Sequence, residues 1–397
     1  MGRMNPLAYL GEQLDAWRAE GTLQRLRVLE SECAPLARFD GRDVINLASN
    51  NYLGLTTHPL LLEAALEATR RYGVGSGAVR TISGTMSLHV ELEEKIARFK
   101  NVEGCVVFQS GFTANAGTVS AILGPEDHIV SDALNHASII DGCRLSRAKI
   151  HVYAHKDVAQ AEEKLAAASQ AGGRVLLISD GVFSMDGDIG PLPKLVELAE
   201  RYGAIMMVDD AHASGVLGRN GRGTVDHFGL HGRVQIQVGT LSKAIGALGG
   251  YVCGSRDLIE FLHQRGRPFL FSTSHPPAVA ATCIAAFDVL EQEPQRIGQL
   301  WENTRYFKEQ LTKEGFDTGV SETPITPVMV GEAAAAHAFS AALFEEGVLA
   351  TGIGFPTVPK GKARVRTIVT ATHTREHLDR ALEAFRRAGR KLGLLAA

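Results

Sequence analysis

The stretch Gly239-Thr240-Leu241-Ser242-Lys243-Ala244-Ile245-Gly246 places a single lysine among small residues, directly after an apolar run at residues 234–238 that alternates like a strand. Lysine is charged and well hydrated, so a buried lysine is uncommon and needs a reason. Partial burial lowers the pKa of the amine and frees it to attack a carbonyl group. A lone lysine of this kind is more often an exposed residue in a Gly-rich turn, so a catalytic role needs support from other residues of the chain.

Short apolar strands alternate with helices on both sides of this stretch. The expected strands are residues 105–108, 128–130, 149–153, 175–178, 204–209, 234–238 and 250–252. Apolar strands separated by helices are typical of an α/β fold with a mostly parallel central sheet and helices on both faces. Ligands of such sheets bind outside the carboxyl ends of the strands, and most polar motifs of this chain follow strands.

The sequence before and after the sheet predicts two further parts. Apolar residues recur at helical spacing within residues 5–30 and predict an amphipathic helix with its continuation. Beyond about residue 280, predicted helices surround strands near 325–330 and 364–370 and indicate a smaller α+β unit. We therefore expect three parts, which are a helical arm at 1–48, a large α/β domain at 49–285 and a small C-terminal domain at 286–397.

Composition narrows the classes of function. The 397 residues carry a net charge of −3 without a long basic or acidic run, which argues against nucleic acid or a membrane surface as a partner. The five cysteines are scattered, lack metal-ligand spacing and look like reduced core residues. The N-terminus has no apolar signal region, and no apolar run is long enough to span a bilayer. We expect a cytoplasmic protein.

Asp209 is the most informative residue outside the lysine stretch. It ends the buried strand of Met207-Val208-Asp209-Asp210-Ala211-His212, where an unpaired carboxylate is costly. A protonated pyridine nitrogen would supply the missing cation and keep pyridoxal phosphate (PLP) an electron sink, and His212 could reach the phenolic oxygen of that ring. The alternatives are an Asp–His structural pair or half of a metal site. No third ligand with convincing spacing follows, so no metal is predicted.

Three further motifs follow strands, and each is weak by itself. The turn at Ser110–Asn115 opens a helix, whose N-terminus favours a phosphate, but it has neither Walker nor GxGxxG spacing. His136 can stack on an aromatic ligand or be a capping residue, and Ser184 can donate to a ligand or belong to a polar turn. Together with Asp209 and Lys243, these motifs predict one pocket in which Lys243 forms a Schiff base with PLP.

The chain resembles the α-oxoamine synthase family of fold-type I PLP-dependent transferases from about residue 5 to 395. The motifs that carry the resemblance are Asn50-Asn51-Tyr52-Leu53-Gly54, residues 131–138 (SDALNHAS), residues 180–187 (DGVFSMDG), Val208-Asp209-Asp210-Ala211-His212 and Gly239-Thr240-Leu241-Ser242-Lys243. The resemblance implies an enzyme in which Lys243 is the Schiff-base lysine and the acid/base at the α-carbon. It pairs Asp209 with the pyridine nitrogen and stacks His136 on the ring.

The same resemblance assigns the remaining cofactor contacts and the substrate contacts. The implied phosphate contacts are the amides of Gly111 and Phe112, the Thr240 hydroxyl, and Ser272 and Thr273 of a partner chain. The implied contacts of the phenolic oxygen are Ser184 and His212, and those of the substrates are Asn50, His136 and Arg366 for the amino acid and Thr357 for the acyl group. A homodimer with a shared active site follows from these assignments, with an amino acid and an acyl-CoA or acyl-carrier thioester as substrates.

Two stretches bear on which family member this is. Residues 131–142 (SDALNHASIIDG) and 358–367 (VPKGKARVRT) look most like 2-amino-3-ketobutyrate coenzyme A ligase. We therefore expect a glycine C-acetyltransferase that condenses glycine with acetyl-CoA, with relaxed acyl specificity as an option. Residues 271–278 (FSTSHPPA) look closer to 8-amino-7-oxononanoate synthases and to ligase-like enzymes with dual activity. The alternative is therefore an 8-amino-7-oxononanoate synthase, which uses L-alanine and a pimeloyl thioester. A non-catalytic PLP-fold binding protein is the alternative from another class, and the intact Lys243 argues against it.

Overall fold

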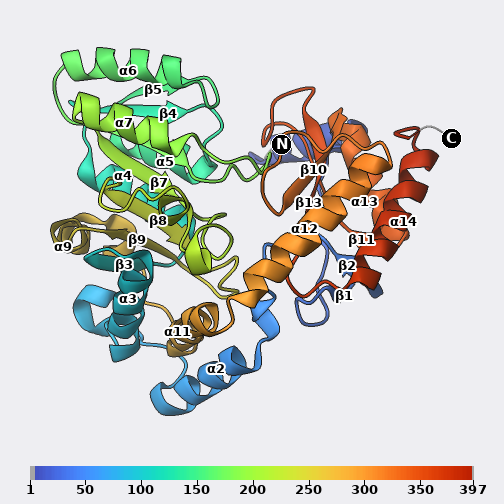
Figure 1. The fold of residues 1–397 in the computed structure, drawn as a ribbon, viewed down its shortest axis with the longest axis horizontal. Coiled ribbons are helices and arrows are strands. Elements are labelled where there is room, and N and C mark those ends of the chain that lie inside the picture. Colours follow the sequence, from blue (N-terminus) through green and yellow to red (C-terminus); the bar gives the residue numbers. More distant parts are fainter. Residues whose placement is uncertain (1–4, 396–397) are drawn as a thin grey trace. The chain divides into compact units, whose positions relative to one another are not determined.

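The computed structural model describes residues 5–395 of the chain. Two compact units make it up (Figure 1). The larger unit comprises residues 50–184 and 188–299, and the described part of the smaller unit comprises residues 5–49, 185–187 and 300–395. These units are defined by compactness and do not test the predicted domain boundaries after residues 48 and 285, which stay predictions.

A seven-stranded sheet forms the centre of the larger unit. Its strands are β3 (Gly104–Phe108), β4 (His128–Asp132), β5 (Lys149–Tyr153), β6 (Val175–Asp180), β7 (Ile205–Asp209), β8 (Ile236–Thr240) and β9 (Gly250–Gly254). They lie in the order β3-β9-β8-β7-β6-β4-β5, and β9 runs antiparallel to both of its neighbours. The other neighbouring pairs are parallel. This confirms the predicted fold class.

Alternate side chains of the central strands pack into two separate hydrophobic cores. In β6, Leu176 and Ile178 join one core, whereas Val175 and Leu177 join the other. The first core includes α4 (Gly111–Ile122), α5 (Ala137–Ser146), α9 (Arg256–Arg265) and α10 (Arg267–Phe271). The second includes α6 (Val158–Gln170) and α7 (Leu192–Tyr202), which Figure 1 shows together. Because both faces are covered, successive apolar residues of a strand such as β6 are buried on opposite faces of the sheet.

The remaining helices of the larger unit surround this sandwich. They are α2 (Pro59–Tyr72), α3 (Ser87–Lys100), the short α8 (Thr224–His227) and α11 (Pro277–Gln292). Helix α11 packs against both α2 and α3. Helix α12 (Gln295–Lys313) begins in the larger unit and continues into the smaller one.

The smaller unit is α+β and contains two three-stranded sheets. One has the order β10 (Ile325–Gly331), β13 (Ala363–Ile368), β12 (Thr351–Ile353), and the other has the order β1 (Leu36–Phe39), β2 (Arg42–Asn46), β11 (Val348–Leu349). Helices α13 (Ala333–Glu345) and α14 (Arg375–Lys391) belong to the same unit. The rings of Phe316, Phe339 and Phe385 pack against one another in its core.

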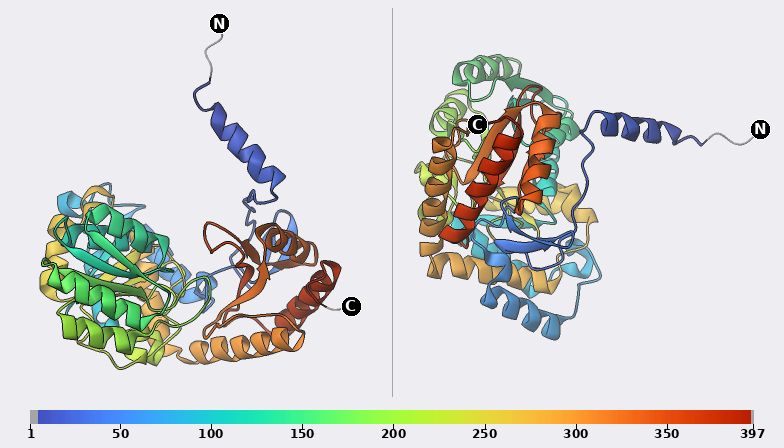
Figure 2. Two further views of the ribbon diagram at one scale, coloured as in Figure 1. Left: turned by 90° about the horizontal axis from the view of Figure 1, so that it is seen from above. Right: turned by 90° about the vertical axis from the view of Figure 1, so that its right-hand side faces the viewer.

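The N-terminal helix is shorter than the sequence predicts. Helix α1 spans Ala8–Ala19, and Gly21 follows with a left-handed φ of 67°. Glycine adopts this conformation without strain and is common just past the end of a helix. None of the α1 side chains is buried, and Figure 2 shows α1 extending away from the sheets of its own unit. The predicted apolar stripe, which includes Leu10, Leu14 and Trp17, is therefore exposed in this chain.

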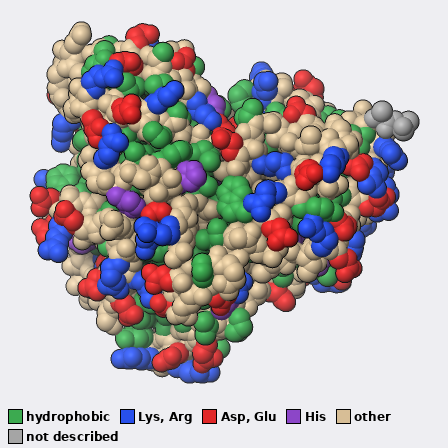
Figure 3. Space-filling view, viewed as in Figure 1, with side chains coloured by type: hydrophobic (Ala, Val, Ile, Leu, Met, Phe, Trp, Pro, Cys, Tyr) green, Lys and Arg blue, Asp and Glu red, His purple; other side chains and the backbone are tan. Residues whose placement is uncertain are grey.

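The surface carries mixed charge. On the face that Figure 3 shows, Lys and Arg side chains are interspersed with Asp and Glu side chains. Among residues 5–395, no helix is both long enough and apolar enough to cross a membrane.

Candidate active site

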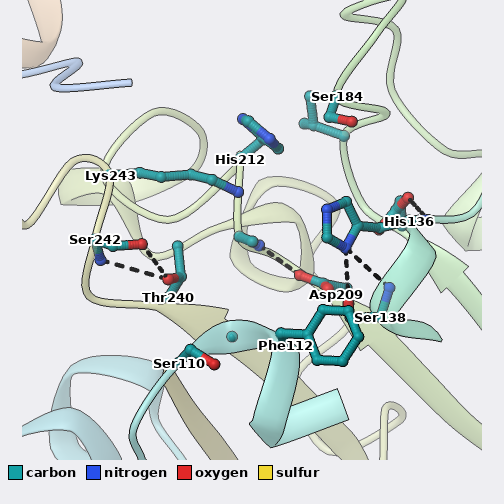
Figure 4. Close-up of a pocket in the computed structure, with 14 residues that line it drawn as sticks. Ser110, Phe112, His136, Ser138, Ser184, Asp209, His212, Thr240, Ser242 and Lys243 are labelled. Carbon is teal, nitrogen blue, oxygen red and sulfur yellow. Dashed lines mark hydrogen bonds between the residues drawn. The ribbon is translucent and has the colours of Figure 1, made fainter. Parts of the chain in front are cut away.

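A pocket of about 200 Å³ lies where several strands of the large sheet end (Figure 4). Strands β6, β7 and β8 bring Asp180, Asp209 and Thr240 to it, and the segment after β4 brings His136. Eight sequence-predicted residues line it, namely Gly111, Phe112, His136, Ser184, Asp209, His212, Thr240 and Lys243. The sheet topology brings them together because the carboxyl ends of parallel strands share one edge.

The start of α4 forms the end of the pocket suited to an anion. Ser110 caps the helix, and its Oγ accepts a hydrogen bond of 3.1 Å from the Thr113 amide. The first amides of a helix have no partner within the helix, and the helix dipole attracts negative charge to them. A Cβ added at Gly111 would lie 3.3 Å from the Thr240 Cβ, so glycine permits the close approach of this turn to β8.

The Asp209 carboxylate is buried and held by two donors. Its Oδ2 accepts a hydrogen bond of 2.6 Å from Asn115 Nδ2, and its Oδ1 accepts one of 2.8 Å from the Ala211 amide. Asn115 Nδ2 also lies 2.9 Å from Ser138 Oγ, which in turn lies 2.7 Å from His136 Nδ1. A continuous polar network therefore connects the buried carboxylate with the His136 ring.

Neither Asn115 nor Ser138 was predicted from the sequence to be a site residue. Asn115 is fully buried within an otherwise small and apolar helix, and Ser138 is buried in the first turn of α5. A buried amide needs hydrogen-bond partners, so a lone asparagine on the apolar face of a predicted helix was the available signal.

Two groups of this network favour their neutral forms. Burial raises the pKa of Asp180 well above its ordinary value, and the nearby Asp209 charge acts in the same direction. Burial also lowers the pKa of His136, and the Lys243 charge contributes to that shift. The backbone amide of His136 donates a 2.9 Å hydrogen bond to Asp180 Oδ2. The His136 ring can therefore stack as a neutral imidazole.

Lys243 and His212 occupy the opposite side of the pocket (Figure 4). The Lys243 side chain is partly buried and extends across the pocket beside His212. His212 Nδ1 lies 2.7 Å from the hydroxyl of Tyr52, whose side chain is buried. The sequence motif at residues 50–54 does not predict this role for Tyr52, because the contact joins residues that are 160 positions apart.

Five predicted residues do not line this pocket. Ser272 and Thr273 follow α10, and Thr273 forms a β-bridge with Val79 and accepts a 2.8 Å hydrogen bond at its carbonyl from Gln109. Asn50 begins the larger unit, whereas Thr357 and Arg366 belong to the smaller unit, with Arg366 on β13.

The pocket fits PLP on three counts. It offers an anion site at Gly111, a buried carboxylate at Asp209 and a lysine amine within one cavity. These match the three groups of the cofactor that need a partner, which are its phosphate, its pyridinium nitrogen and its aldehyde. Fold and site together define a fold-type I PLP-dependent transferase.

Comparison with known proteins agrees with this class. Residues 42–385 match the family model for aminotransferase class I and II. The 8-amino-7-oxononanoate synthase of Symbiobacterium thermophilum is 62% identical over 98% of this chain and 99% of its own length, and that of Thermoanaerobacter pseudethanolicus is 56% identical over 100% of both chains. A solved structure of SPT with PLP superposes with a TM-score of 0.94 at 32% identity, covering 98% of this chain and 100% of that one. The chain belongs to the aminotransferase class I and II family and, within it, to the α-oxoamine synthases, which confirms the predicted family, cofactor and enzyme class.

The predicted glycine C-acetyltransferase activity is wrong. The relatives at 56–62% identity over nearly the full chain are 8-amino-7-oxononanoate synthases, which was the alternative. The stretch at 131–142 includes His136 and Ser138, which line the pocket proposed for the cofactor, so it is a poor guide to the acyl chain. The stretch at 271–278, which pointed to the alternative, was the better indicator.

Proposed function

We propose that this protein is an 8-amino-7-oxononanoate synthase, which joins L-alanine to a pimeloyl thioester with loss of carbon dioxide. The observation that carries the proposal is full-length identity of up to 62% to synthases of that name, in a chain whose strand ends assemble the pocket described above. The carbon–carbon bond forms between the alanine α-carbon and the thioester carbonyl carbon. The thiol and the alanine carboxylate leave, the latter as carbon dioxide.

Three groups of this chain would hold the cofactor. PLP supplies an electron sink that lets bonds at the alanine α-carbon break heterolytically. Asp209 would hold the proton on the pyridine nitrogen, because Asn115 and Ala211 fix its carboxylate in place. The amides at the start of α4 and the Thr240 hydroxyl would bind the phosphate.

The remaining pocket residues would orient the ring and move protons. Lys243 would bind the cofactor covalently, and its amine would take the proton from the alanine α-carbon and return one to the product. His136 would stack on the ring as a neutral imidazole, in keeping with its lowered pKa. Ser184 and His212 would donate hydrogen bonds to the phenolic oxygen, with the Tyr52 hydroxyl fixing the orientation of His212.

We also propose a homodimer in which Ser272 and Thr273 of one chain complete the phosphate site of the other. The apolar stripe of α1 supports an assembly, because Leu10, Leu14 and Trp17 are exposed in the single chain. The contacts of Asn50, Thr357 and Arg366 with the substrates stay predictions. The cytoplasmic location also stays a prediction, supported by five scattered cysteines that lack metal-ligand spacing.

An activity panel tests the substrates. Purified enzyme loaded with PLP is offered L-alanine or glycine, each with pimeloyl-CoA or acetyl-CoA, and the release of free thiol is followed. We expect the highest kcat/KM for L-alanine with pimeloyl-CoA. A higher kcat/KM for glycine with acetyl-CoA, or no turnover with any pair, would overturn the proposal.

The Lys243→Ala variant tests the nucleophile. We expect it to lose the visible absorbance band of the lysine-bound cofactor and to lose turnover. Lys164→Ala, which removes a partly exposed lysine of α6 outside the pocket, is the control and should retain both. Turnover by Lys243→Ala at the wild-type rate would contradict the assigned role.

A further inference from the structure

His155 joins two loops of the larger unit through two buried carboxylates. Its Nδ1 lies 3.0 Å from Asp132 Oδ1, and its Nε2 lies 2.9 Å from Asp188 Oδ2. The side chains of Asp132 and Asp188 are 0% and 1% exposed. Lys156 adds to the same group, with its backbone amide 2.8 Å from Asp132 Oδ2 and its Nζ 3.0 Å from Asp188 Oδ2. These four residues are called the His155 cluster below.

The charges of this cluster favour a protonated imidazole. Burial alone would lower the pKa of His155, but hydrogen bonds to Asp132 and Asp188 and their negative charges raise it to about 9. An imidazolium donates from both ring nitrogens, whereas a neutral imidazole donates from only one. The protonated form therefore satisfies both carboxylates at neutral pH.

Each carboxylate anchors a loop that carries a pocket residue. Asp132 ends β4, and its Oδ1 also accepts a 2.8 Å hydrogen bond from the Leu134 amide, two residues before His136. On the other side, the Asp188 carbonyl accepts a 3.0 Å hydrogen bond from the Phe183 amide, directly before Ser184. The Phe183 and His155 rings pack nearly perpendicular to each other at a centroid distance of 4.4 Å.

We infer that His155 is a positioning residue of the cofactor pocket. Its bridge between Asp132 and Asp188 holds the segments 132–136 and 181–184 of the larger unit at a fixed separation, so that His136 and Ser184 face the same cavity. His155 itself does not line that cavity. The inference rests on the proposed cofactor site and is independent of which acyl thioester the enzyme uses.

A second histidine of the same unit supplies a matched control. His231 Nε2 lies 3.0 Å from the buried Asp226, and the two histidines are similarly exposed, at 28% for His231 and 25% for His155. The His231–Asp226 pair joins residues five positions apart, and neither residue lines the pocket. Replacing His231 therefore removes a His–Asp pair without releasing a pocket loop.

Titration of the apo-proteins with PLP at 25 °C tests the inference, with thermal melting measured in parallel. The loss of one hydrogen bond to a charged group predicts a rise of about tenfold in the PLP dissociation constant of His155→Gln. His231→Gln should stay within about twofold of the wild type, because it only affects a distant pair.

A purely structural role predicts a different pattern. A lower melting temperature of His155→Gln with a PLP dissociation constant within about twofold of the wild type would overturn the inference. If His155→Gln does not fold, Asp188→Asn, which keeps the Asp132–His155 contact, takes its place under the same two outcomes. A wild-type protein that binds no PLP would overturn the proposed function first and this inference with it.

Discussion

Two charge clusters include residues close along the chain to those of the pocket, and the clusters differ in their cation. In one, Lys100 donates to Asp210 Oδ2 at 2.9 Å and to the Arg222 carbonyl at 2.6 Å, and Asp210 also accepts from the amide and hydroxyl of Thr224. Both side chains of the Lys100–Asp210 pair are 0% exposed. In the other, the His155 cluster, the bridging cation is an imidazolium that is one-quarter exposed.

The two clusters secure different parts of the same site. Asp210 follows Asp209 directly and precedes His212 by two residues, so the Lys100 pair fixes the segment that carries both. The His155 cluster fixes the segments that carry His136 and Ser184. Lysine and aspartate ordinarily keep their charges from pH 6.5 to 9, whereas a histidine loses its charge within or near that range. The His155 cluster therefore contains an ion pair that a rise in pH can release, whereas the Lys100 pair contains no histidine.

Breaking the Lys100–Asp210 pair gives the largest expected effect. Lys100→Met leaves the Asp210 carboxylate buried without its cation, which should lower the free energy of unfolding by about 3–5 kcal/mol. Urea unfolding of the apo-protein measures this difference. Lys164→Met, on the surface of α6, is the control and should change the free energy by no more than about 0.5 kcal/mol. A loss of under about 1 kcal/mol in Lys100→Met would show that the pair is not needed for stability.

Raising the pH gives the next largest effect, and it separates the two clusters. The folded-state pKa of His155 is raised to about 9 from its ordinary value of 6.5, so its contribution to stability is fully present below pH 6.5 and is lost as the pH rises through 9. The shift corresponds to about 3 kcal/mol at most. The groups that face His155 are Asp132, Asp188 and Lys156.

The measurement is the difference in free energy of unfolding between wild type and His155→Gln from pH 6 to 9.5. We expect this difference to shrink as the pH rises. The deficit of Lys100→Met should stay constant over the same range. If the loss of unfolding free energy in His155→Gln is also independent of pH, the two clusters do not differ in their response to pH.

Asn115→Ala tests the Asp209 side of the pocket. The substitution removes the 2.6 Å hydrogen bond to the buried carboxylate, which is worth about 2 kcal/mol for a charged acceptor. We expect weaker PLP binding, measured by titration of the apo-protein. Ser120→Ala on the same helix removes only a hydroxyl that bonds to the Ala116 carbonyl, and it should leave PLP binding unchanged. Equal affinities for the two variants would argue against a role of Asn115 in holding Asp209.

Tyr52→Phe gives the smallest expected effect. It removes the hydroxyl that lies 2.7 Å from His212 Nδ1, which should cost about 1 kcal/mol of stability. It should also change the pH dependence of the cofactor absorbance band, because His212 loses the group that fixes its orientation. Tyr202→Phe, whose hydroxyl bonds to Glu162 at the surface, is the control and should leave that pH dependence as in the wild type. An unchanged band in Tyr52→Phe would show that His212 is oriented by other contacts.

Much of the fold could be predicted because its signals are local. Each of the seven predicted strands overlaps a strand of the large sheet, since strands covered on both faces are rich in apolar residues. The predicted N-terminal helix was too long. Apolar residues continue at helical spacing past Gly21, but the helical backbone ends at Ala19. The pocket residues that follow strands were also predictable, because parallel strands end at one edge.

The amino-acid sequence by itself determined the strand order along the chain, the lysine in its small-residue setting and the carboxylate at the end of a buried strand. Only the tertiary structure decided which distant side chains meet. Tyr52 reaches His212 across 160 positions, Asn115 reaches Asp209 across 94, and His155 reaches Asp188 across 33. The physical reason is that strand and helix patterns arise from neighbouring residues, whereas these contacts depend on how whole elements pack. The lysine among small residues can thus be recognised from the sequence, but the buried groups that position the other pocket residues cannot.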